Sequence, residues 1–147
     1  MFYKSTRNSE VKVSSAQAIA QGISVDGGLF VPEEIPSISM EDLKKLGEQD
    51  YRARAKFVFG KFLTDFTEAE IAYCVDNAYN TKAFDTDNIA ELAHLFDGTY
   101  MLELWHGPTC AFKDMALQIL PYLLTTSTKK LHSDKKVVIL VATSGDT

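Results

Sequence analysis

The sequence predicts an α/β protein in which a small, mainly helical unit (residues 1–82) precedes the first part of an α/β layer (residues 83–147). Helix-start signals are concentrated in the first unit. In the second unit, two apolar stretches flank Asp97-Gly98, and the run VVILVA occupies residues 137–142. A run without polar alternation is typical of a strand buried on both faces of a parallel sheet. With the helix expected before it, this strand indicates the beginning of an α/β layer.

The first 32 residues are expected to hold a short helix between two extended pieces. Residues 2–4 are a candidate N-terminal strand. Ser14 suits the N-cap of a helix that ends at Gly22, because serine accepts hydrogen bonds from free amides and glycine tolerates the C-terminal turn. The stretch DGGLFVP (26–32) is typical of a turn followed by a short extended segment.

Two further helix starts carry fuller signals. Thr67 and Glu70 form a capping box, and Ser39 has the same arrangement with Asp42 in the first turn. Hydrophobic pairs flank both starts as staples: Ile38 with Leu43, and Phe66 with Ile71. Behind Thr67, apolar residues follow the amphipathic period and include Cys74, which we therefore predict to be a core residue. Another helix is expected over about 50–63.

The second unit is expected to begin with a hairpin. Residues 90–96 and 99–105 are apolar stretches separated by Asp97-Gly98, the strongest short hairpin signal. A helical interpretation of 88–96 stays open, because its apolar residues also fit a helical period.

A helix is then expected from near Ala111 to about Thr126. Pro121 lies inside it and should kink it, because the proline ring clashes with the carbonyl of Leu117. The charged connector 129–136 leads to the predicted strand.

Composition excludes several classes of protein. Hydrophobic residues make up 46% and charged residues 24%, as in a globular protein, and the net charge of −5 argues against nucleic acid as a partner. No apolar run is long enough for a membrane span or a signal peptide. Two cysteines without metal-ligand spacing favour neither a disulfide framework nor a metal site, so we expect a cytoplasmic protein.

The extent of the chain is the next expectation. A strand buried on both faces needs neighbours that these residues do not all supply, so we expect the front part of a longer protein. A flexible tail ending a small domain is the alternative. An unfinished sheet exposes strand edges, which favours self-association.

The stretch HGPTCAFKDMALQ (106–118) carries the first chemical signal. Lys113 stands where the positive end of a helix disfavours a cation. Trp105 and Phe112 are placed to desolvate its amine, and both effects lower a lysine pKa toward the neutral form that attacks carbonyl groups. An ordinary solvated lysine is the alternative. Cys110 as a nucleophile, with His106 as its base, is a weaker interpretation.

The second signal is ATSGDT (142–147), at the carboxyl end of the predicted strand, where open α/β sheets bind ligands. Gly145 permits a tight turn. Ser144, Asp146, Thr147 and the backbone amides are suitable partners for a polar ligand. Ordinary turn chemistry explains the same residues.

Together, ELWHGPTCAFKDMALQ (103–118) and TSGDT (143–147) resemble the threonine synthase family, whose usual form is close to E-L-F-H-G-P-T-x-A-F-K-D and T-S-G-D-T-G. The stretches STR (5–7), AIAQGIS (18–24) and DGGLFVP (26–32) are also similar, so the resemblance covers essentially the whole chain. The chain departs from the family pattern at three positions: it has Trp105 in place of Phe, Cys110 in place of Leu, and Pro121 within the helix.

The resemblance implies a pyridoxal-phosphate enzyme of the tryptophan-synthase-β-like fold, fold type II. It implies that Lys113 holds the cofactor as an internal aldimine and then serves as acid and base, while O-phospho-L-homoserine and water become L-threonine and phosphate. Phe112 and Ser144, Gly145, Asp146 and Thr147 would lie beside the cofactor, with Asp146 near the ring hydroxyl. For Arg7, a contact with the substrate phosphate and a surface salt bridge both stay open.

The resemblance also implies that parts of the site are absent. The glycine-rich loop that holds the cofactor phosphate comes late in the family's sequences, and the Gly27-Gly28 pair here reads as a turn. The partner of the pyridine nitrogen is also late. We therefore expect this chain alone to be inactive. Two alternatives are a related pyridoxal-phosphate lyase, acting on a phosphorylated amino acid or on threonine or serine, and a non-catalytic fragment with a structural role.

Overall fold

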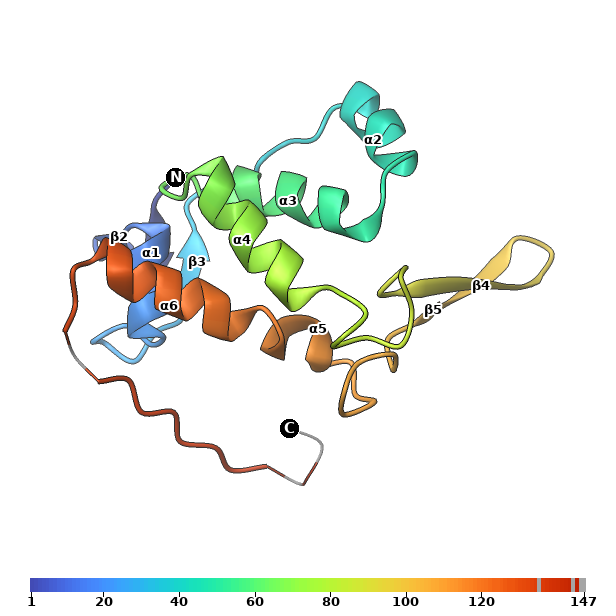
Figure 1. Ribbon diagram of the computed structural model, residues 1–147. Helices are drawn as coiled ribbons and strands as arrows, with labels where there is room; N and C mark the ends of the chain where they lie inside the picture. Colours follow the sequence, from blue (N-terminus) through green and yellow to red (C-terminus); the bar gives the residue numbers. More distant parts are fainter. Residues whose placement is uncertain (135, 144, 146–147) are drawn as a thin grey trace.

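The computed structural model describes residues 1–134, 136–143 and 145, and shows a helical body from which a β-hairpin projects (Figure 1). Its elements in chain order are β1 (Tyr3–Ser5), β2 (Lys12–Val13), α1 (Ser15–Gln21), β3 (Phe30–Pro32), α2 (Met40–Gly47), α3 (Tyr51–Phe62), α4 (Glu68–Ala78), β4 (Glu91–Phe96), β5 (Thr99–Glu103), α5 (Asp114–Leu117) and α6 (Leu120–Lys130). The predicted mixture of helices and strands is confirmed. Within the described part of the chain, no helix is long and apolar enough to cross a membrane.

The N-terminal strand and the extended piece after the DGG turn pair with each other. They form an antiparallel sheet of order β2-β1-β3, in which Tyr3 lies opposite Val13 on one side and Pro32 on the other. The turn at 26–28 brings β3 back along β1, and the amide of Leu29 donates to Thr6 Oγ1 over 3.0 Å.

The predicted starts of α1, α2 and α4 are confirmed. Ser14 Oγ accepts from the Gln17 amide, and α1 ends at Gly22 with φ of 75°. Complete capping boxes begin α2 and α4, each with a side chain that accepts from the third helical amide and a carboxylate that accepts from the N-cap amide. These caps provide hydrogen-bond acceptors for amides that have no partner inside the helix. The starts of these helices can therefore be predicted from the sequence.

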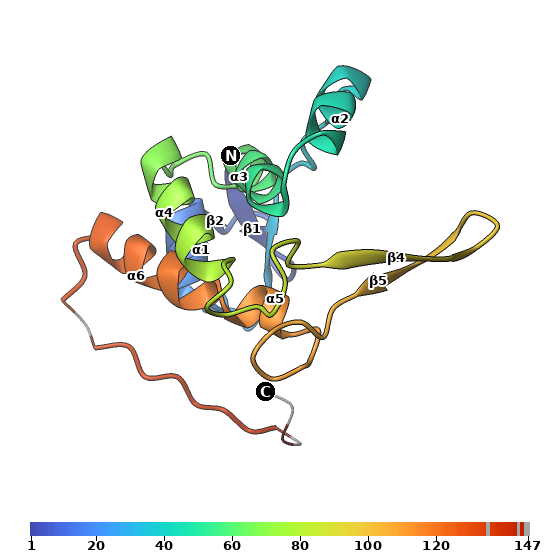
Figure 2. The same cartoon turned by 45° about the vertical axis from the view of Figure 1, so that its right-hand side comes forward.

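The core lies where α4, α6 and α1 meet, with α3 packed on α4 (Figures 1 and 2). Val75 and Cys74 of α4 are 0% and 1% exposed, which confirms the prediction for Cys74. Burial raises the pKa of the Cys74 thiol. From α6, Leu123 enters the same core, which therefore continues across position 82. The domain boundary drawn at this position stays a prediction.

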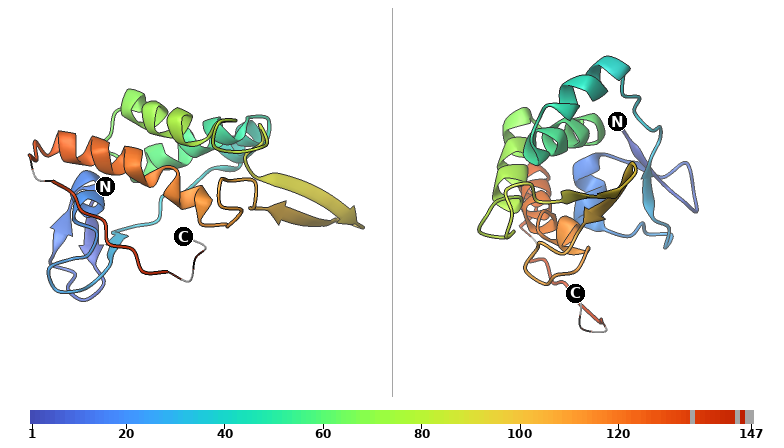
Figure 3. Two further views of the ribbon diagram at one scale, coloured as in Figure 1. Left: turned by 60° about the horizontal axis from the view of Figure 1, so that its bottom comes forward. Right: turned by 90° about the vertical axis from the view of Figure 1, so that its right-hand side faces the viewer.

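The hairpin is confirmed, and the helical alternative for its first strand is wrong. Strands β4 and β5 are antiparallel, with Leu92 opposite Leu102. Asp97 and Gly98 between them both have positive φ, of 37° and 75°, as a tight hairpin turn requires. The hairpin extends away from the helices as an arm in Figures 1 and 2 and in the left view of Figure 3.

The single helix predicted from Ala111 to Thr126 is two helices. The first, α5, is one short turn, and α6 begins at Leu120 with Pro121 in its first turn. Proline is tolerated there because the amides of a first helical turn have no partner inside the helix. Pro121 therefore lies at the start of a second helix, whereas the sequence suggested a kink within one.

The prediction of a buried parallel strand at 137–142 is wrong for the described structure. Residues 136–143 are assigned to no strand, and Val138 and Leu140 are 74% and 92% exposed. Both sheets within the described residues are antiparallel. An apolar β-prone segment becomes a strand only when neighbouring strands take up its backbone groups, and such neighbours are absent from the described chain around it.

Candidate functional site

Lys113 lies where a turn enters the short helix α5. It occupies the N-cap, with helical φ and ψ of −63° and −22°, and Asp114 is the first residue of the helix. The carboxylate of Asp114 is buried and accepts two hydrogen bonds of 2.9 Å, from the amide and the hydroxyl of Thr109. These bonds tie the two ends of the 109–114 loop together, so the backbone that carries Lys113 is held from inside the protein.

Gly107 allows this buried arrangement. A Cβ atom at this position would lie 2.5 Å from Asp114 Cβ and 2.6 Å from its Oδ2, closer than van der Waals contact permits. The glycine of the HGPT motif is thus required because Asp114 packs directly against it. Cys110 in the same turn is exposed and has φ of 56°.

The side chain of Lys113 is partly buried, and its Nζ lies 4.9 Å from the centroid of the Phe112 ring. The expected contact with Phe112 is therefore present, although that ring is itself 64% exposed. Trp105 instead packs against His106, with ring centroids 5.6 Å apart. Because α5 has only four residues, its amides present the electrostatic effect of a single turn.

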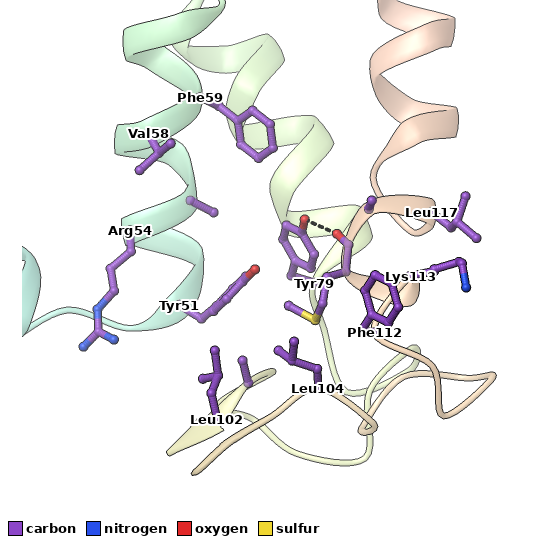
Figure 4. A pocket seen from close by; sticks show the side chains of 14 residues that line it. Tyr51, Arg54, Val58, Phe59, Tyr79, Leu102, Leu104, Phe112, Lys113 and Leu117 are labelled. Carbon is purple, nitrogen blue, oxygen red and sulfur yellow. Dashed lines mark hydrogen bonds between the residues drawn. The ribbon is translucent and has the colours of Figure 1, made fainter. Parts of the chain in front are cut away.

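Lys113 contributes to the wall of an open cavity of about 830 Å³. Helix α3, the end of α4, the base of the hairpin and α5 surround it, and its lining is largely apolar, as in Val58, Phe59, Leu102 and Leu104 (Figure 4). Lys113 lies at the margin of this group, and in the view of Figure 4 its amine points away from the centre. The cavity therefore has an apolar wall, with the side chain of Lys113 at its edge.

Tyr79 connects the N-terminal helices to α5. Its hydroxyl donates to the carbonyl of Met115 over 2.6 Å, two residues after Lys113. Its ring packs edge-on against Tyr51, with centroids 5.0 Å apart. Burial raises the pKa of Tyr79 far above its usual value, so the hydroxyl stays protonated and remains a donor.

His106 lies between two carboxylates at the entrance to the turn. Its Nδ1 is 2.6 Å from Asp85 Oδ1, and its Nε2 is 2.7 Å from Glu103 Oε2. The hydrogen bonds to Glu103 and then to Asp85 raise the pKa of His106 above its usual value. With both ring nitrogens bonded to acids, His106 is unsuited to act as a base for Cys110.

Arg7 is part of a unit that joins two N-terminal motifs. Its Nη1 donates to the backbone carbonyl of Asp26 over 3.2 Å, while Ser5 Oγ donates to the Asp26 carboxylate over 2.8 Å. The amide of Gly28, followed by Ser5, lowers the pKa of Asp26. The STR and DGG stretches are therefore one structural corner that connects β1 to β3.

Of the residues predicted for the site, the structure brings Lys113 and Phe112 together. Ser144, Asp146 and Thr147 lie outside the described residues. Gly145 is described, and its amide donates to Thr143 Oγ1 over 2.9 Å. Sequence reasoning missed Tyr79 and Asp85, because these partners lie far from the turn along the chain. It also missed Glu103, although this residue is only three positions before His106.

Comparisons with known proteins identify the family of the chain. The family described as "Threonine synthase N terminus" matches residues 2–79, more than half of the chain. The chain is 35% identical over 147 residues to threonine synthase-like 1 of Pongo abelii, covering 96% of this chain and 19% of that protein. It is 36% identical over 148 residues to threonine synthase of Pseudomonas aeruginosa, covering 100% and 31%.

A solved structure is also similar, that of threonine synthase from Brucella melitensis with bound pyridoxal phosphate. The TM-score is 0.82 at 31% identity, and the match covers 90% of this chain and 28% of that one. The chain thus spans less than a third of the length of these relatives. From the family match over residues 2–79, and from these likenesses in sequence and structure, we conclude that the chain belongs to the threonine synthase family and corresponds to its N-terminal part.

Proposed function

We propose that this chain forms the lysine-bearing part of a pyridoxal-phosphate-dependent threonine synthase, which converts O-phospho-L-homoserine and water to L-threonine and phosphate. The observation that carries the proposal is the placement of Lys113, at a braced turn beside an apolar cavity. The family match supports it, as does the Brucella melitensis relative, whose structure contains pyridoxal phosphate.

The described residues fit one end of this cofactor. Its aldehyde needs an amine, which Lys113 supplies, and its ring needs an apolar neighbour, for which Phe112 is placed. Its phosphate needs several donors. The other cation lining the cavity is Arg54, whose Nε and Nη2 already donate to the carbonyls of Leu46 and Gly47. Within the described residues, the cavity thus lacks a phosphate cradle.

The roles of this chain's residues follow from that fit. When bound, pyridoxal phosphate serves as an electron sink for charge that develops at the substrate α-carbon. Lys113 Nζ is the atom that we assign to bind the cofactor aldehyde and, once displaced, to accept and return the substrate α-proton. Asp114 and Thr109 hold the backbone of this lysine in place. Phe112 shields one side of the amine from water.

We further propose that Ser144, Gly145, Asp146 and Thr147 contact the cofactor once the missing cradle is supplied. The 147 residues alone are then inactive and hold the cofactor only through an adventitious Schiff base. The substrate is a small molecule, neither nucleic acid nor membrane is a partner, and the compartment is the cytoplasm. Self-association through uncovered strand edges is part of the same proposal.

Reductive trapping tests the role of Lys113. The chain would be incubated with pyridoxal phosphate, reduced with borohydride and mapped by peptide mass spectrometry. This would be done alone and as a fusion to the remaining part of the Pseudomonas aeruginosa relative. We expect non-stoichiometric label on the chain alone, but stoichiometric label on Lys113 and threonine formation in the fusion. Lys113→Ala should abolish both.

The matched control is Lys44→Ala on an exposed face of α2, which should leave labelling and turnover unchanged. Label spread evenly over the lysines of the fusion, or turnover retained by Lys113→Ala, would overturn the assignment. Stoichiometric label on the unfused chain that survives dialysis would overturn its predicted inactivity.

A related pyridoxal-phosphate lyase is the second candidate, because the chain is as similar to threonine synthase-like 1 as to a threonine synthase. Release of ammonia from O-phospho-L-homoserine by the fusion, without threonine formation, would favour this candidate. A purely structural role would be indicated if the fusion bound the cofactor at no lysine of this chain.

A further inference from the structure

The environment of His106 restricts its protonation state. The two carboxylates that contact it, Asp85 and Glu103, can only accept hydrogen bonds when they are ionised. A neutral imidazole has one N–H, whereas both ring nitrogens of His106 lie within 2.7 Å of a carboxylate oxygen. Donation at both ends therefore requires the imidazolium form.

The charges around this ring favour the same form. Asp85 lies in the segment between α4 and β4, and Glu103 ends β5. Glu91 of β4 lies directly opposite Glu103 in the hairpin, and its own pKa is lowered by Thr86 first and slightly by His106. Acidic residues directly opposite each other destabilise a strand pair. A cation at His106 offsets that repulsion at the base of the hairpin.

His106 also joins three segments of backbone. Its side chain connects the segment of Asp85 to the end of β5, and its own carbonyl accepts from the Asp85 amide over 3.0 Å. The next residue, Gly107, lies directly against Asp114. Because Gly107 packs against Asp114, a displacement of His106 would shift Gly107 relative to Asp114, the residue next to Lys113.

We propose that the imidazolium of His106, held by Asp85 and Glu103, is a positioning residue that keeps the 107–110 turn and Lys113 in place. The role assigned to Lys113 here rests on the proposed function, whereas the bracing of the turn does not. His106 touches neither cofactor nor substrate in this scheme. It acts through Gly107 and Asp114.

The hydrogen bonds from His106 to Asp85 and Glu103 should weaken as the pH rises. The pKa of His106 in the folded protein is raised, so its stabilisation is complete below the ordinary value of about 6.5. The stabilisation is lost as the pH increases through the folded pKa, where one of the two donors disappears. Replacing Asp85 by Asn removes one negative charge and should move this loss to lower pH.

Hydrogen exchange of a single amide reports the state of the turn. The Thr109 amide donates to Asp114, so its protection factor measures the bracing. In the wild-type chain we expect the protection factor to fall by about tenfold above the His106 pKa, because a hydrogen bond to a charged group stabilises by a free energy equivalent to about tenfold or more. In His106→Gln we expect the protection factor to be low at every pH. In Asp85→Asn the midpoint should shift to lower pH.

Two controls separate this effect from general unfolding. The Glu70 amide, which donates to Thr67 in the distant cap of α4, should keep its protection throughout. His132→Gln, at an exposed position after α6, should leave the Thr109 profile unchanged. Equal Thr109 protection in wild type and His106→Gln, or an unmoved midpoint in Asp85→Asn, would overturn the proposal.

Reductive labelling of the fusion protein connects the turn to Lys113. If His106→Gln weakens Thr109 protection and lowers the share of label on Lys113, the positioning role is supported. If Thr109 protection falls while Lys113 labelling is unaltered, the positioning of Lys113 is overturned. If wild-type label never falls on Lys113, the proposed function fails, while the pH-dependent protection of Thr109 still supports the bracing by His106.

Discussion

Replacement of Gly107 by alanine tests the packing on which the candidate site depends. The added Cβ would lie 2.5 Å, 2.6 Å and 2.8 Å from Cβ, Oδ2 and Cγ of Asp114, so Asp114 or the turn must move. Overpacking a close contact costs about 1–3 kcal/mol. Weakening the bonds that Asp114 accepts from Thr109 leaves a buried carboxylate poorly satisfied, at a further cost of about 1–3 kcal/mol.

We therefore expect Gly107→Ala to lower the free energy of unfolding by about 2–6 kcal/mol, the sum of these two costs. Urea denaturation followed by circular dichroism measures this change. The control is Gly47→Ala in the exposed last turn of α2, where an added Cβ meets nothing within 4 Å. That change should be neutral or stabilising by up to about 1 kcal/mol, because alanine favours helix more than glycine.

A double-mutant cycle identifies the cause of the loss. An Asp114→Ala background removes the contacts with Cγ and Oδ2 and the buried carboxylate but keeps the 2.5 Å contact with Cβ, so the second substitution should cost less than in the wild type by about the 1–3 kcal/mol assigned to the carboxylate. A Gly107→Ala chain as stable as the wild type would refute the account. So would a cost that stays the same in the Asp114→Ala background.

Two further predictions concern the helices that support the site. Tyr79→Phe removes the donor to the Met115 carbonyl and should lower the free energy of unfolding, measured by urea denaturation, by about 1 kcal/mol. The control Tyr73→Phe, at a half-exposed ring, should have little effect. Equal effects of the two substitutions would contradict the role of the Tyr79 hydrogen bond. For Glu70, burial opposes ionisation, but the hydrogen bonds from Thr67 and Lys130 outweigh it and lower the pKa. The stabilisation that ionised Glu70 contributes is present above the unfolded pKa and is lost as the pH falls through the folded pKa. The free energy of unfolding of Glu70→Gln, measured from pH 3 to 7, should therefore vary less with pH than that of the wild type. The pH dependence of the control Glu68→Gln should not differ from that of the wild type.

Features whose physical cause is local were predictable from the sequence. The caps of α1, α2 and α4 use a side chain and an amide no more than three residues apart, so the sequence contains both partners. The hairpin turn at Asp97-Gly98 depends only on residues that tolerate positive φ. Lys113 was singled out for the same reason, because its neighbours and motif are contiguous.

Features that need distant partners were decided by the tertiary structure. The run at 137–142 has the composition of a buried strand, but a strand exists only when another backbone accepts its hydrogen bonds, and the described residues provide none there. Pro121 begins α6 because the chain turns before it, which its sequence neighbours do not reveal. Asp85 and the hydroxyl of Tyr79 reach the 106–115 stretch from 21 and 36 residues away. The sequence by itself thus determined where α1, α2 and α4 start, where the hairpin turns and which lysine to propose for the site. Only the tertiary structure decided what braces the turn that carries this lysine, because bracing depends on side chains that folding alone brings into contact.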